Sequence, residues 1–445
     1  MPLKTILFLV GLLLAGIGSL RWPLLGVIGY MAIYLVDPRS QWWGRFLPLQ
    51  RFSMVMAVCL GIAILVHWSN LARRAPRFGS LSILLLAFLA LLWISMAIGL
   101  PPNPTSWMQI DKMTKLFIFL FMLRRVVTSM SDLDAIFWCM FLCGAYIGWD
   151  AFTASANRFA GGRLDSFAGG DFGEANAIGL QLAATLPIAA ALFMKYRKLW
   201  QRGMVVLAVP LMMNTIVQTR SRTAFLALGA GLLVSLVYSP RRYRFPLVGC
   251  AVLGAAGFFA LTDPGFWQRM ETIKDPAQEG SANQRLVIWR ASLPMFRDHP
   301  LGVGIGNFGY AVESYVQEGE DRDSHNTYVT CYTELGIQGA VLLLIILVHQ
   351  WRSLGRASRT ARSIGAGDAE LYAFALRASL VVYLVGGFTI KRLYAEAFWW
   401  YLVLPSVILH VVMILQRQHR AESEEAAPPA DEPGEPAVPP LRPFA

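Results

Sequence analysis

Apolar stretches recur along the chain from residue 3 to residue 415, with short polar segments between them. The strongest approach the roughly 20 residues that a helix needs to cross the hydrocarbon of a bilayer; they cover residues 3–20, 79–100, 177–194, 222–239, 336–350 and 397–415. Weaker stretches cover residues 22–36, 52–68, 114–128, 133–152, 203–218, 245–262 and 373–388. The pattern predicts an all-α integral membrane protein with about 12 or 13 transmembrane helices and one long polar loop over residues 263–335.

The composition favours a membrane protein over a soluble one. Of the 445 residues, 56% are hydrophobic and only 15% are charged, and the mean hydropathy is +0.48. A soluble chain of this length carries more charge. Residues 3–20 also have the form of a cleavable signal peptide, because Lys4 precedes their apolar core. The length of this stretch and the immediate start of the next one favour a retained helix.

Basic residues predict how the chain is oriented. A net charge of +11 would suggest a nucleic-acid partner for a soluble protein, but in membrane proteins Lys and Arg concentrate in cytoplasmic loops, and we expect no nucleic acid here. The basic loops hold Lys195 to Arg202, Arg241 to Arg244, and Arg352, Arg356, Arg359 and Arg362. Alternation of the spans then places residues 150–176, 219–222, 263–335 and 389–396 outside, and Arg73, Arg74, Arg77, Arg124 and Arg125 inside.

Two segments fit this organisation less simply. The loop 38–51 carries three arginines yet lies outside if every apolar stretch spans, so an early stretch is a candidate re-entrant segment. Residues 1–420 form the expected membrane domain, and the Ala-, Glu- and Pro-rich residues 421–445 are predicted to be a disordered cytoplasmic tail. No inverted duplication of the transporter kind stands out.

Charges in the outer loops are informative because they oppose the orientation bias and are costly at a membrane rim. The first such loop places Arg158 and Arg163 in a glycine-rich run before a span that opens near Asn176. The second, QTRSRTAF, holds Arg220 and Arg222 in a turn too short to leave the interface. These guanidinium groups either line the mouth of a cavity or reach lipid phosphates.

The long loop predicts a helix in its middle. Large apolar side chains recur there at helical spacing, at Leu286, Trp289, Leu293 and Phe296. This spacing is expected of an amphipathic helix on the membrane surface or on the helical body, ending near His299 and Pro300. Arg285, placed at its first turn, is either a solvated charge or an anion ligand. The glycines at 302, 304 and 306 lack the strand and the Lys-Ser or Lys-Thr of a phosphate-binding loop.

His325 is the histidine that lies in a polar segment leading into the outer membrane face. Histidine can accept a proton near neutral pH, so His325 is the natural base or hydrogen-bond donor, with helix capping as the alternative. We interpret the acidic run Glu318, Glu320, Asp321 and Asp323 as solvated surface, with weak cation binding as the alternative. Several arginines around one histidine suit a phosphorylated substrate and need no metal. The five cysteines form no CxxC pair.

These residues resemble motifs of the O-antigen ligase and polymerase superfamily of bacterial envelope enzymes. The resemblance is strongest over residues 158–350. It rests on Arg285-x-x-x-Trp289, on His-Pro-Leu-Gly-Val-Gly at 299–304, on His325-Asn326-x-Tyr328 with Glu334-Leu-Gly-Ile, and on Ser221-Arg222. The spans before residue 150 match in general character, and the segment Lys391-Arg392-Leu-Tyr has no assignment.

The resemblance implies a multi-helix glycosyltransferase of the bacterial inner membrane that works at the periplasmic face among membrane lipids. Its donor would be a glycan on undecaprenyl diphosphate, its acceptor lipid A-core or another glycan or protein, and no cofactor or nucleotide sugar would be needed. By position, Arg163, Arg222 and Arg285 would hold the diphosphate with Arg220 as a helper, and His325 would act on the acceptor hydroxyl. Trp289, Asn326, Tyr328 and Asn176 would support the site.

Three alternatives stay open. A polymerase that joins repeat units would share the diphosphate-binding motifs, and so would a ligase that glycosylates proteins. From another class, a transporter of a lipid-linked glycan would use the same arginines without chemistry.

Overall fold

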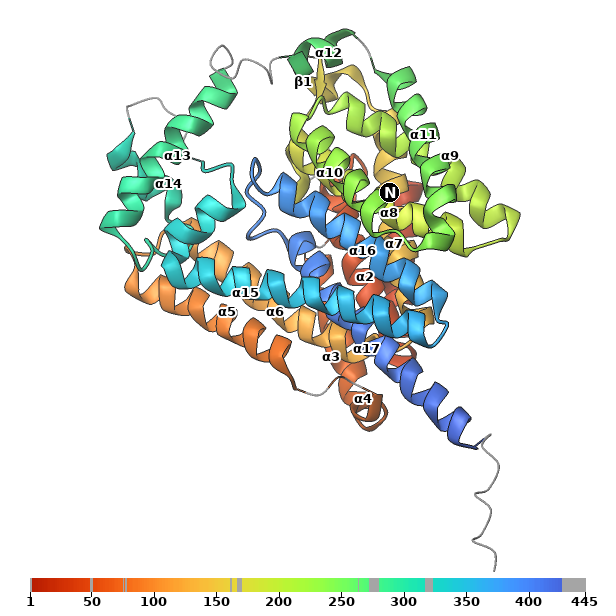
Figure 1. Cartoon of the computed structure of the whole chain (residues 1–445). Coiled ribbons are helices and arrows are strands. Elements are labelled where there is room, and N and C mark those ends of the chain that lie inside the picture. The colour runs from red at the N-terminus through yellow and green to blue at the C-terminus, as the bar shows by residue number, and fades with distance from the viewer. Residues whose placement is uncertain are drawn as a thin grey trace, which may run out of the picture.

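Every predicted apolar stretch lies on a helix in the computed structural model (Figure 1). The structure describes residues 2–48, 51–74, 76, 78–160, 162–165, 170–262, 264–271, 280–316 and 323–425. The helices are α1 (Leu3–Arg21), α2 (Pro23–Val36), α3 (Phe52–Val66), α4 (Trp68–Arg74), α5 (Ser80–Ile98), α6 (Pro104–Val126), α7 (Met130–Phe152), α8 (Ala175–Lys195), α9 (Leu199–Gln218), α10 (Arg222–Tyr238), α11 (Arg244–Leu261), α12 (Pro264–Glu271), α13 (Gly280–Asp298), α14 (Phe308–Ala311), α15 (Thr327–Ser363), α16 (Gly367–Gly386) and α17 (Glu396–Glu425). The all-α prediction is confirmed, apart from a small antiparallel hairpin of β1 (Phe159–Ala160) and β2 (Arg163–Leu164).

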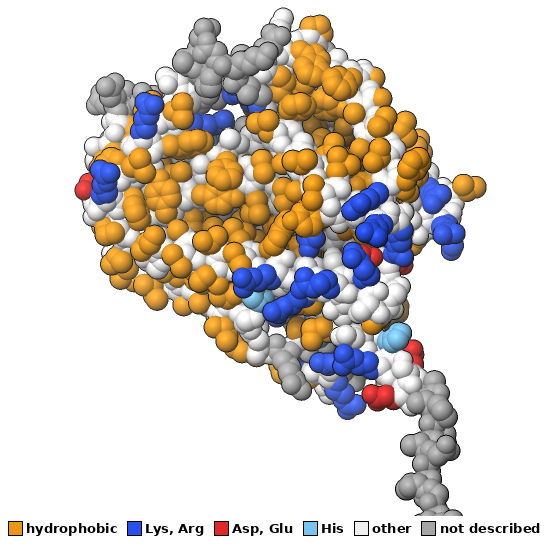
Figure 2. All heavy atoms as spheres, viewed as in Figure 1, with side chains coloured by type: hydrophobic (Ala, Val, Ile, Leu, Met, Phe, Trp, Pro, Cys, Tyr) orange, Lys and Arg blue, Asp and Glu red, His pale blue; other side chains and the backbone are white. Residues whose placement is uncertain are grey.

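The loops predicted to be cytoplasmic meet at one end of the helices, which we call the basic end. Lys195, the last residue of α8, lies 3.7 Å from the carboxylate of Asp368, in the first turn of α16. The guanidinium group of Arg242, before α11, lies against Gly367 at the start of α16. Figure 2 shows Lys and Arg side chains gathered in a band beside a broad apolar surface. This separation of charge from apolar surface suits a bilayer, and the assignment of the basic end to the cytoplasm stays a prediction.

The loops predicted to be outer meet at the other end, which we call the opposite end. Arg163, before α8, donates to the backbone oxygen of Thr219, after α9. Tyr146, near the end of α7, donates to Gln41 at 3.2 Å, so the early loop also lies here. Within the described part of the chain, long helices therefore alternate in direction between the two ends: α1, α2, α3, α5 to α11, α15, α16 and α17.

Eight of these helices are long and apolar enough to cross a membrane, counted over the described residues. The count is nine if α3 and α4, which bend by 86° at His67, form one span. This bend marks either a broken span or a re-entrant segment. The number falls below the predicted dozen because α2, for example, has only 14 residues, or about 21 Å of helix, against the ~30 Å of a hydrocarbon core.

Two helices exceed their predicted bounds. The helix α6 begins at Pro104, ahead of the apolar stretch at 114, because Asn103 and Ser106 form a capping box at its first turn. The helix α17 continues through Glu425, into the predicted tail. The remainder of that tail, residues 426–445, lies outside the described residues.

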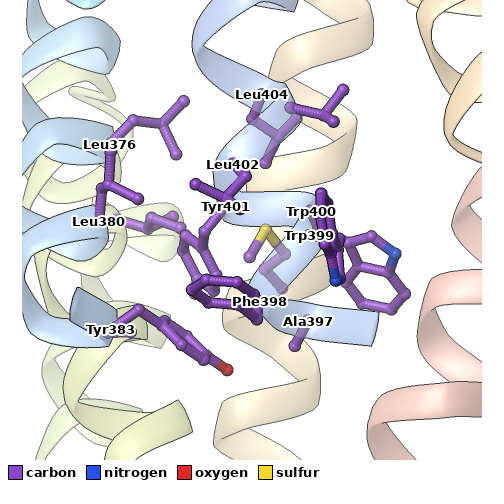
Figure 3. Close-up of a cluster of buried hydrophobic side chains, with 14 of the residues drawn as sticks. Leu376, Leu380, Tyr383, Ala397, Phe398, Trp399, Trp400, Tyr401, Leu402 and Leu404 are labelled. Carbon is purple, nitrogen blue, oxygen red and sulfur yellow. The ribbon is translucent and has the colours of Figure 1, made fainter. Parts of the chain in front are cut away.

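Aromatic side chains of α16 and α17 are among the largest fully buried side chains of the described residues (Figure 3). The rings of Tyr383 and Tyr401 lie 4.7 Å apart between centroids. Trp399 lies 4.7 Å from Phe88 of α5 and 4.8 Å from Phe117 of α6. Burial of large aromatic surfaces is a strong source of packing free energy. It holds the facing ends of α16 and α17, and therefore the short loop between them at the opposite end.

The glycine-rich turn at residues 299–307 is built into the helical body. Its Gly304 donates to the backbone oxygen of Glu334 at 3.0 Å. The Glu334 carboxylate accepts the backbone N–H of Gly306 at 2.8 Å. The turn lies beside a break in α15, where Gly336 has a φ of 69°. These glycines serve close backbone packing, in keeping with the rejection of a phosphate-binding loop.

The helix predicted in the long loop is present as α13, but the face that it packs against the helical body is not the one formed by the large apolar residues. The side chains of Leu286 and Leu293 are 39% and 55% exposed. The buried positions are Ile288, Ala291, Ser292 and Met295. Small side chains at two of these positions let α13 approach α15 closely, which the spacing of the large apolar residues could not indicate. In Figure 1, α13 and α14 stand to one side of the α8–α11 group.

We expect Gly302→Ala to destabilise the protein. Gly302 has a φ of 93°, and an added Cβ would meet the backbone oxygen of Glu334 at 2.4 Å. Strain of this kind costs about 1–3 kcal/mol before the clash is counted. Thermal unfolding of the purified protein measures the loss. Gly249→Ala in α11 is the control, because nothing lies within 4 Å of its added Cβ; equal unfolding temperatures for the two variants would contradict the role of the turn.

Candidate active site

Arg163 is held by bonds within its own loop and to the turn after α9, two segments that are predicted to be outer. It is the first residue of β2, and its Nε donates to the backbone oxygen of Thr219 at 2.9 Å. Its Nη2 donates to Oδ1 of Asn176, in the first turn of α8, at 2.8 Å. The same Asn176 oxygen accepts the hydroxyl of Ser221 at 2.8 Å. The structure therefore brings Arg163, Asn176 and the QTRSRTAF turn together.

Arg220 lies between the hairpin and the start of the long loop. Its backbone has a φ of 46°, which is uncommon outside glycine. Its guanidinium group packs against Gly162, in the β1–β2 turn, and against Gly265, in α12. A Cβ at Gly265 would lie 2.9 Å from both Nη atoms of Arg220. The glycines thus make room for this side chain beside Arg163.

Arg222 opens α10 next to the loop between α16 and α17. The preceding Ser221 caps the helix, accepting the backbone N–H of Ala224 at 3.2 Å. The following Thr223 shares a hydrogen bond of 2.5 Å with Thr389. The helices α8, α10 and α15 all begin at this end of the molecule. Helix N-termini carry partial positive charge, which adds to that of the arginines and favours an anion.

His325 lies immediately before α15, and its side chain is half-buried. Its backbone is left-handed, with a φ of 43°. The cap of α15 is Asn326, whose Oδ1 accepts the backbone N–H groups of Tyr328 and Val329 at 2.9 and 3.1 Å. The Tyr328 hydroxyl donates to the backbone oxygen of Leu384 in α16 at 2.7 Å. Asn326 and Tyr328 therefore anchor the helix start that presents His325.

Arg285 and Trp289 approach the histidine segment from α13. The Trp289 Nε1 donates to the backbone oxygen of Ser324, next to His325, at 2.8 Å. Arg285 is half-buried and lies one turn before Trp289. Because α13 begins at Gly280, Arg285 is in its second turn and not at the first turn as predicted. The motif Arg-x-x-x-Trp thus places both residues on the side of the helix nearest His325.

Asp323 and Lys391 form an ion pair beside His325 that the sequence interpretation missed. Lys391 Nζ lies 2.9 Å from Asp323 Oδ2, and Asp323 Oδ1 accepts the backbone N–H of His325 at 3.1 Å. Burial works to raise the pKa of Asp323, but Lys391 and His325 together outweigh it and leave this pKa below its usual value. The interpretation of Asp323 as solvated surface is therefore wrong. The rest of the acidic run, residues 318–321, lies outside the described residues.

A signal for Lys391 was present in the sequence. Lys391 and Arg392 are adjacent cations in a predicted outer loop, where they oppose the orientation bias. Arg392 is buried and donates to the backbone oxygen of Asp171, and the Asp171 carboxylate pairs with Lys112 of α6. Although burial works to raise the pKa of Asp171, Lys112 keeps it below its usual value. The segment that had no assignment thus ties α17 to the loop that carries Arg163.

Two family models match the chain. Residues 207–344 match a family described as O-antigen ligase. Over this segment, the chain is similar to the O-antigen ligase family, which supports a relationship to that superfamily. Residues 3–168 match a family of unknown function, and no curated protein matches the chain. A solved structure titled "Structural coordination of polymerization and crosslinking by a peptidoglycan synthase complex" is 15% identical, covers 76% of this chain and 97% of that chain, and has a TM-score of 0.44.

The ligase match contains most of the predicted site but not all of it. Arg220, Arg222, Arg285 and His325 lie within residues 207–344. Arg163 falls in the segment of unknown function, and Asn176 lies in neither match. The hydrogen bond of Arg163 to Thr219 therefore joins the segment that matches the ligase family to the N-terminal part of the chain. Over the described residues, no group of three or more His, Cys, Asp or Glu side chains is arranged to hold a metal ion.

We expect Asn176→Ala to loosen Arg163. The substitution removes the oxygen that Arg163 and Ser221 share, and a hydrogen bond to a charged group contributes about 1.5–3 kcal/mol. The thermal unfolding temperature of the purified protein should fall by several degrees. Thr153→Ala in the same outer loop is the control, because its exposed hydroxyl bonds only to the backbone of its own helix. An unchanged unfolding temperature in Asn176→Ala would count against this network.

Proposed function

We propose that this protein is a membrane glycosyltransferase of the ligase type. It transfers a glycan from undecaprenyl diphosphate to a hydroxyl of an acceptor, such as lipid A-core, at the periplasmic face of the bacterial inner membrane. The site consists of Arg163, Arg222, Arg285 and His325, with Arg220 as a helper.

One observation carries the proposal: Arg163 is fixed against the turn that holds Arg220 and Arg222, where three helices begin. The planar guanidinium group matches phosphate oxygens and keeps its charge at any physiological pH. The starts of α8, α10 and α15 add partial positive charge in the same place. Such a cluster at the end of a helical bundle suits a lipid diphosphate, whose chain stays in the bilayer while its phosphates reach the rim.

The chemistry follows from this arrangement. The acceptor oxygen attacks the anomeric carbon of the glycan, and the bond from that carbon to the diphosphate oxygen breaks. The acceptor proton passes to His325, which acts as a general base. The arginines stabilise the charge that develops on the departing diphosphate. Attack from the face opposite the leaving group inverts the anomeric centre, and the arginines supply the charge stabilisation that a metal would otherwise provide.

Two neighbouring activities use the same site chemistry. A polymerase would take a second lipid-linked glycan as its acceptor, and a protein ligase would take a side-chain hydroxyl. A transporter of the lipid-linked glycan would bind the diphosphate but break no bond. The ligase interpretation is favoured over the transporter because His325 is held at a constrained backbone position by Asp323, and the binding of a diphosphate alone does not need a fixed histidine.

We expect His325→Ala to lose at least about 100-fold in glycan transfer, since a positioned general base contributes 10²–10⁴-fold. Binding of the lipid-linked donor should be unchanged, because the arginines remain. Transfer is measured with the purified protein in lipid nanodiscs, using donor and acceptor isolated from the same bacterium. His299→Ala, at the glycine-rich turn, is the control for loss of a histidine. Full transfer by His325→Ala would overturn the enzyme proposal and favour the transporter.

Arg222→Ala and Arg285→Ala should each abolish transfer while leaving membrane insertion and folding intact. Each removes a cation that binds the diphosphate and stabilises the additional charge that develops as the diphosphate departs, so the rate should fall by about 100-fold or more. Arg290→Ala is the matched control, because Arg290 is exposed on the same helix as Arg285. Activity, together with detergent-resistant insertion and unfolding temperature, separates the outcomes. Wild-type activity in either variant contradicts the diphosphate site.

A further inference from the structure

The backbone at His325 adopts a conformation that its own sequence does not favour. A φ of 43° strains the backbone of a residue that has a side chain, and His325 adopts this angle. Such strain persists only where surrounding contacts determine the conformation. Here the flanking residues are bound on both sides. Ser324 Oγ shares a bond of 2.6 Å with Thr330, and the backbone oxygen of Ser324 accepts Trp289 Nε1 at 2.8 Å.

The Asp323 carboxylate is the group that acts on His325 directly. One of its oxygens accepts the His325 backbone N–H at 3.1 Å, and the other pairs with Lys391 at 2.9 Å. The side chains of Asp323 and Lys391 are 34% and 37% exposed, so the pair lies at the edge of the site and not in the core. Burial works to lower the pKa of Lys391, but Asp323, with Glu334 and Glu174, outweighs it and raises this pKa above its usual value. Both partners therefore stay charged around neutral pH.

Lys391 is itself fixed relative to α15 by residues 387–396, which we call the connector. The backbone oxygen of Phe388 accepts Asn326 Nδ2 at 2.9 Å. The Thr327 hydroxyl donates to the backbone oxygen of Ile390 at 2.8 Å and accepts the backbone N–H of Arg392 at 2.9 Å. These bonds surround Lys391 on both sides along the chain. The backbone on either side of Lys391 is therefore fixed, and this holds the Lys391 ammonium group next to Asp323.

The connector also reaches the arginine cluster. Thr389 bonds to Thr223, next to Arg222, and Arg392 bonds to Asp171 in the loop that carries Arg163. A shift of Lys391 would therefore act on His325 through Asp323, while Arg163 keeps its own contacts with Thr219 and Asn176. A change at Lys391 should therefore alter the position of His325 more than the binding of the diphosphate.

We propose that Asp323 and Lys391 are positioning residues that hold His325 in the orientation needed to take the acceptor proton. The inference rests on the proposed function, because it assigns His325 the role of base. Ion pairs that solvent reaches contribute little to the free energy of folding. We therefore assign this partly exposed pair a role in fixing the backbone that carries His325.

The test is a steady-state comparison of full-length variants in lipid nanodiscs, with donor and acceptor isolated from the same bacterium. Asp323→Asn and Lys391→Met should each lower kcat by about 10- to 100-fold, since small displacements of catalytic groups have effects of this size. The KM for the lipid-linked donor should stay within about two-fold. Lys391→Arg should restore most of kcat. The double variant should be no slower than the slower single one, because the two residues act as a unit.

Two controls keep the outcome interpretable. Lys115→Met breaks the exposed Lys115–Asp111 pair of α6 and should leave kcat and KM unchanged. Unfolding temperatures of all variants, together with Lys391→Arg, exclude a simple loss of folding. A raised donor KM with unchanged kcat in Lys391→Met would overturn the proposal, because Lys391 would then be a diphosphate ligand. Wild-type kinetics in Asp323→Asn and Lys391→Met, with an inactive His325→Ala, would contradict this inference and leave the proposed function standing. An active His325→Ala would contradict the proposed function itself.

Discussion

Hydrocarbon offers no water to a backbone N–H or carbonyl group, so a chain that crosses a bilayer must satisfy these groups within its own helices. This constraint determines where polar chemistry can occur in this protein. The helices carry the apolar surface, and the charged side chains gather where helices begin and end. At the opposite end, α8, α10 and α15 all start close to Arg163, Arg222 and His325. The partial positive charge of these helix starts and the guanidinium groups act in the same direction on an anion.

The same constraint explains how the long loop is attached. The helix α15 breaks at Gly336, and the turn at residues 299–307 supplies partners for the backbone there. Gly304 bonds to the oxygen of Glu334, whose carboxylate in turn accepts Gly306. The loop is thereby joined to the helical body rather than lying free above it. It carries α13 with it, which sets Trp289 against the segment of His325.

The arginines and the histidine could be predicted because each violates an expectation for its place in the chain. A cation in a predicted outer loop opposes the orientation bias, and this singled out Arg163, Arg220 and Arg222 without any knowledge of contacts. The same signal was present at Lys391, but its significance depends on Asp323, 68 positions away in the chain. A long-range partner of this kind leaves no periodic pattern. Asp323 was for the same reason taken as surface, since it stands in an acidic run.

The sequence by itself determined the helical class, the apolar stretches, the alternation of basic and outer loops, and the residue types of the candidate site. Each of these depends on the hydrophobicity or charge of one segment, and each segment partitions between bilayer and water according to its own composition. The tertiary structure decided which face of α13 is buried, because small residues at Ala291 and Ser292 allow a close approach. It also decided that Arg163 meets Thr219 and Asn176, and that Lys391 meets Asp323. These contacts depend on how helices far apart in the chain pack together, and hydrophobic periodicity does not encode that packing.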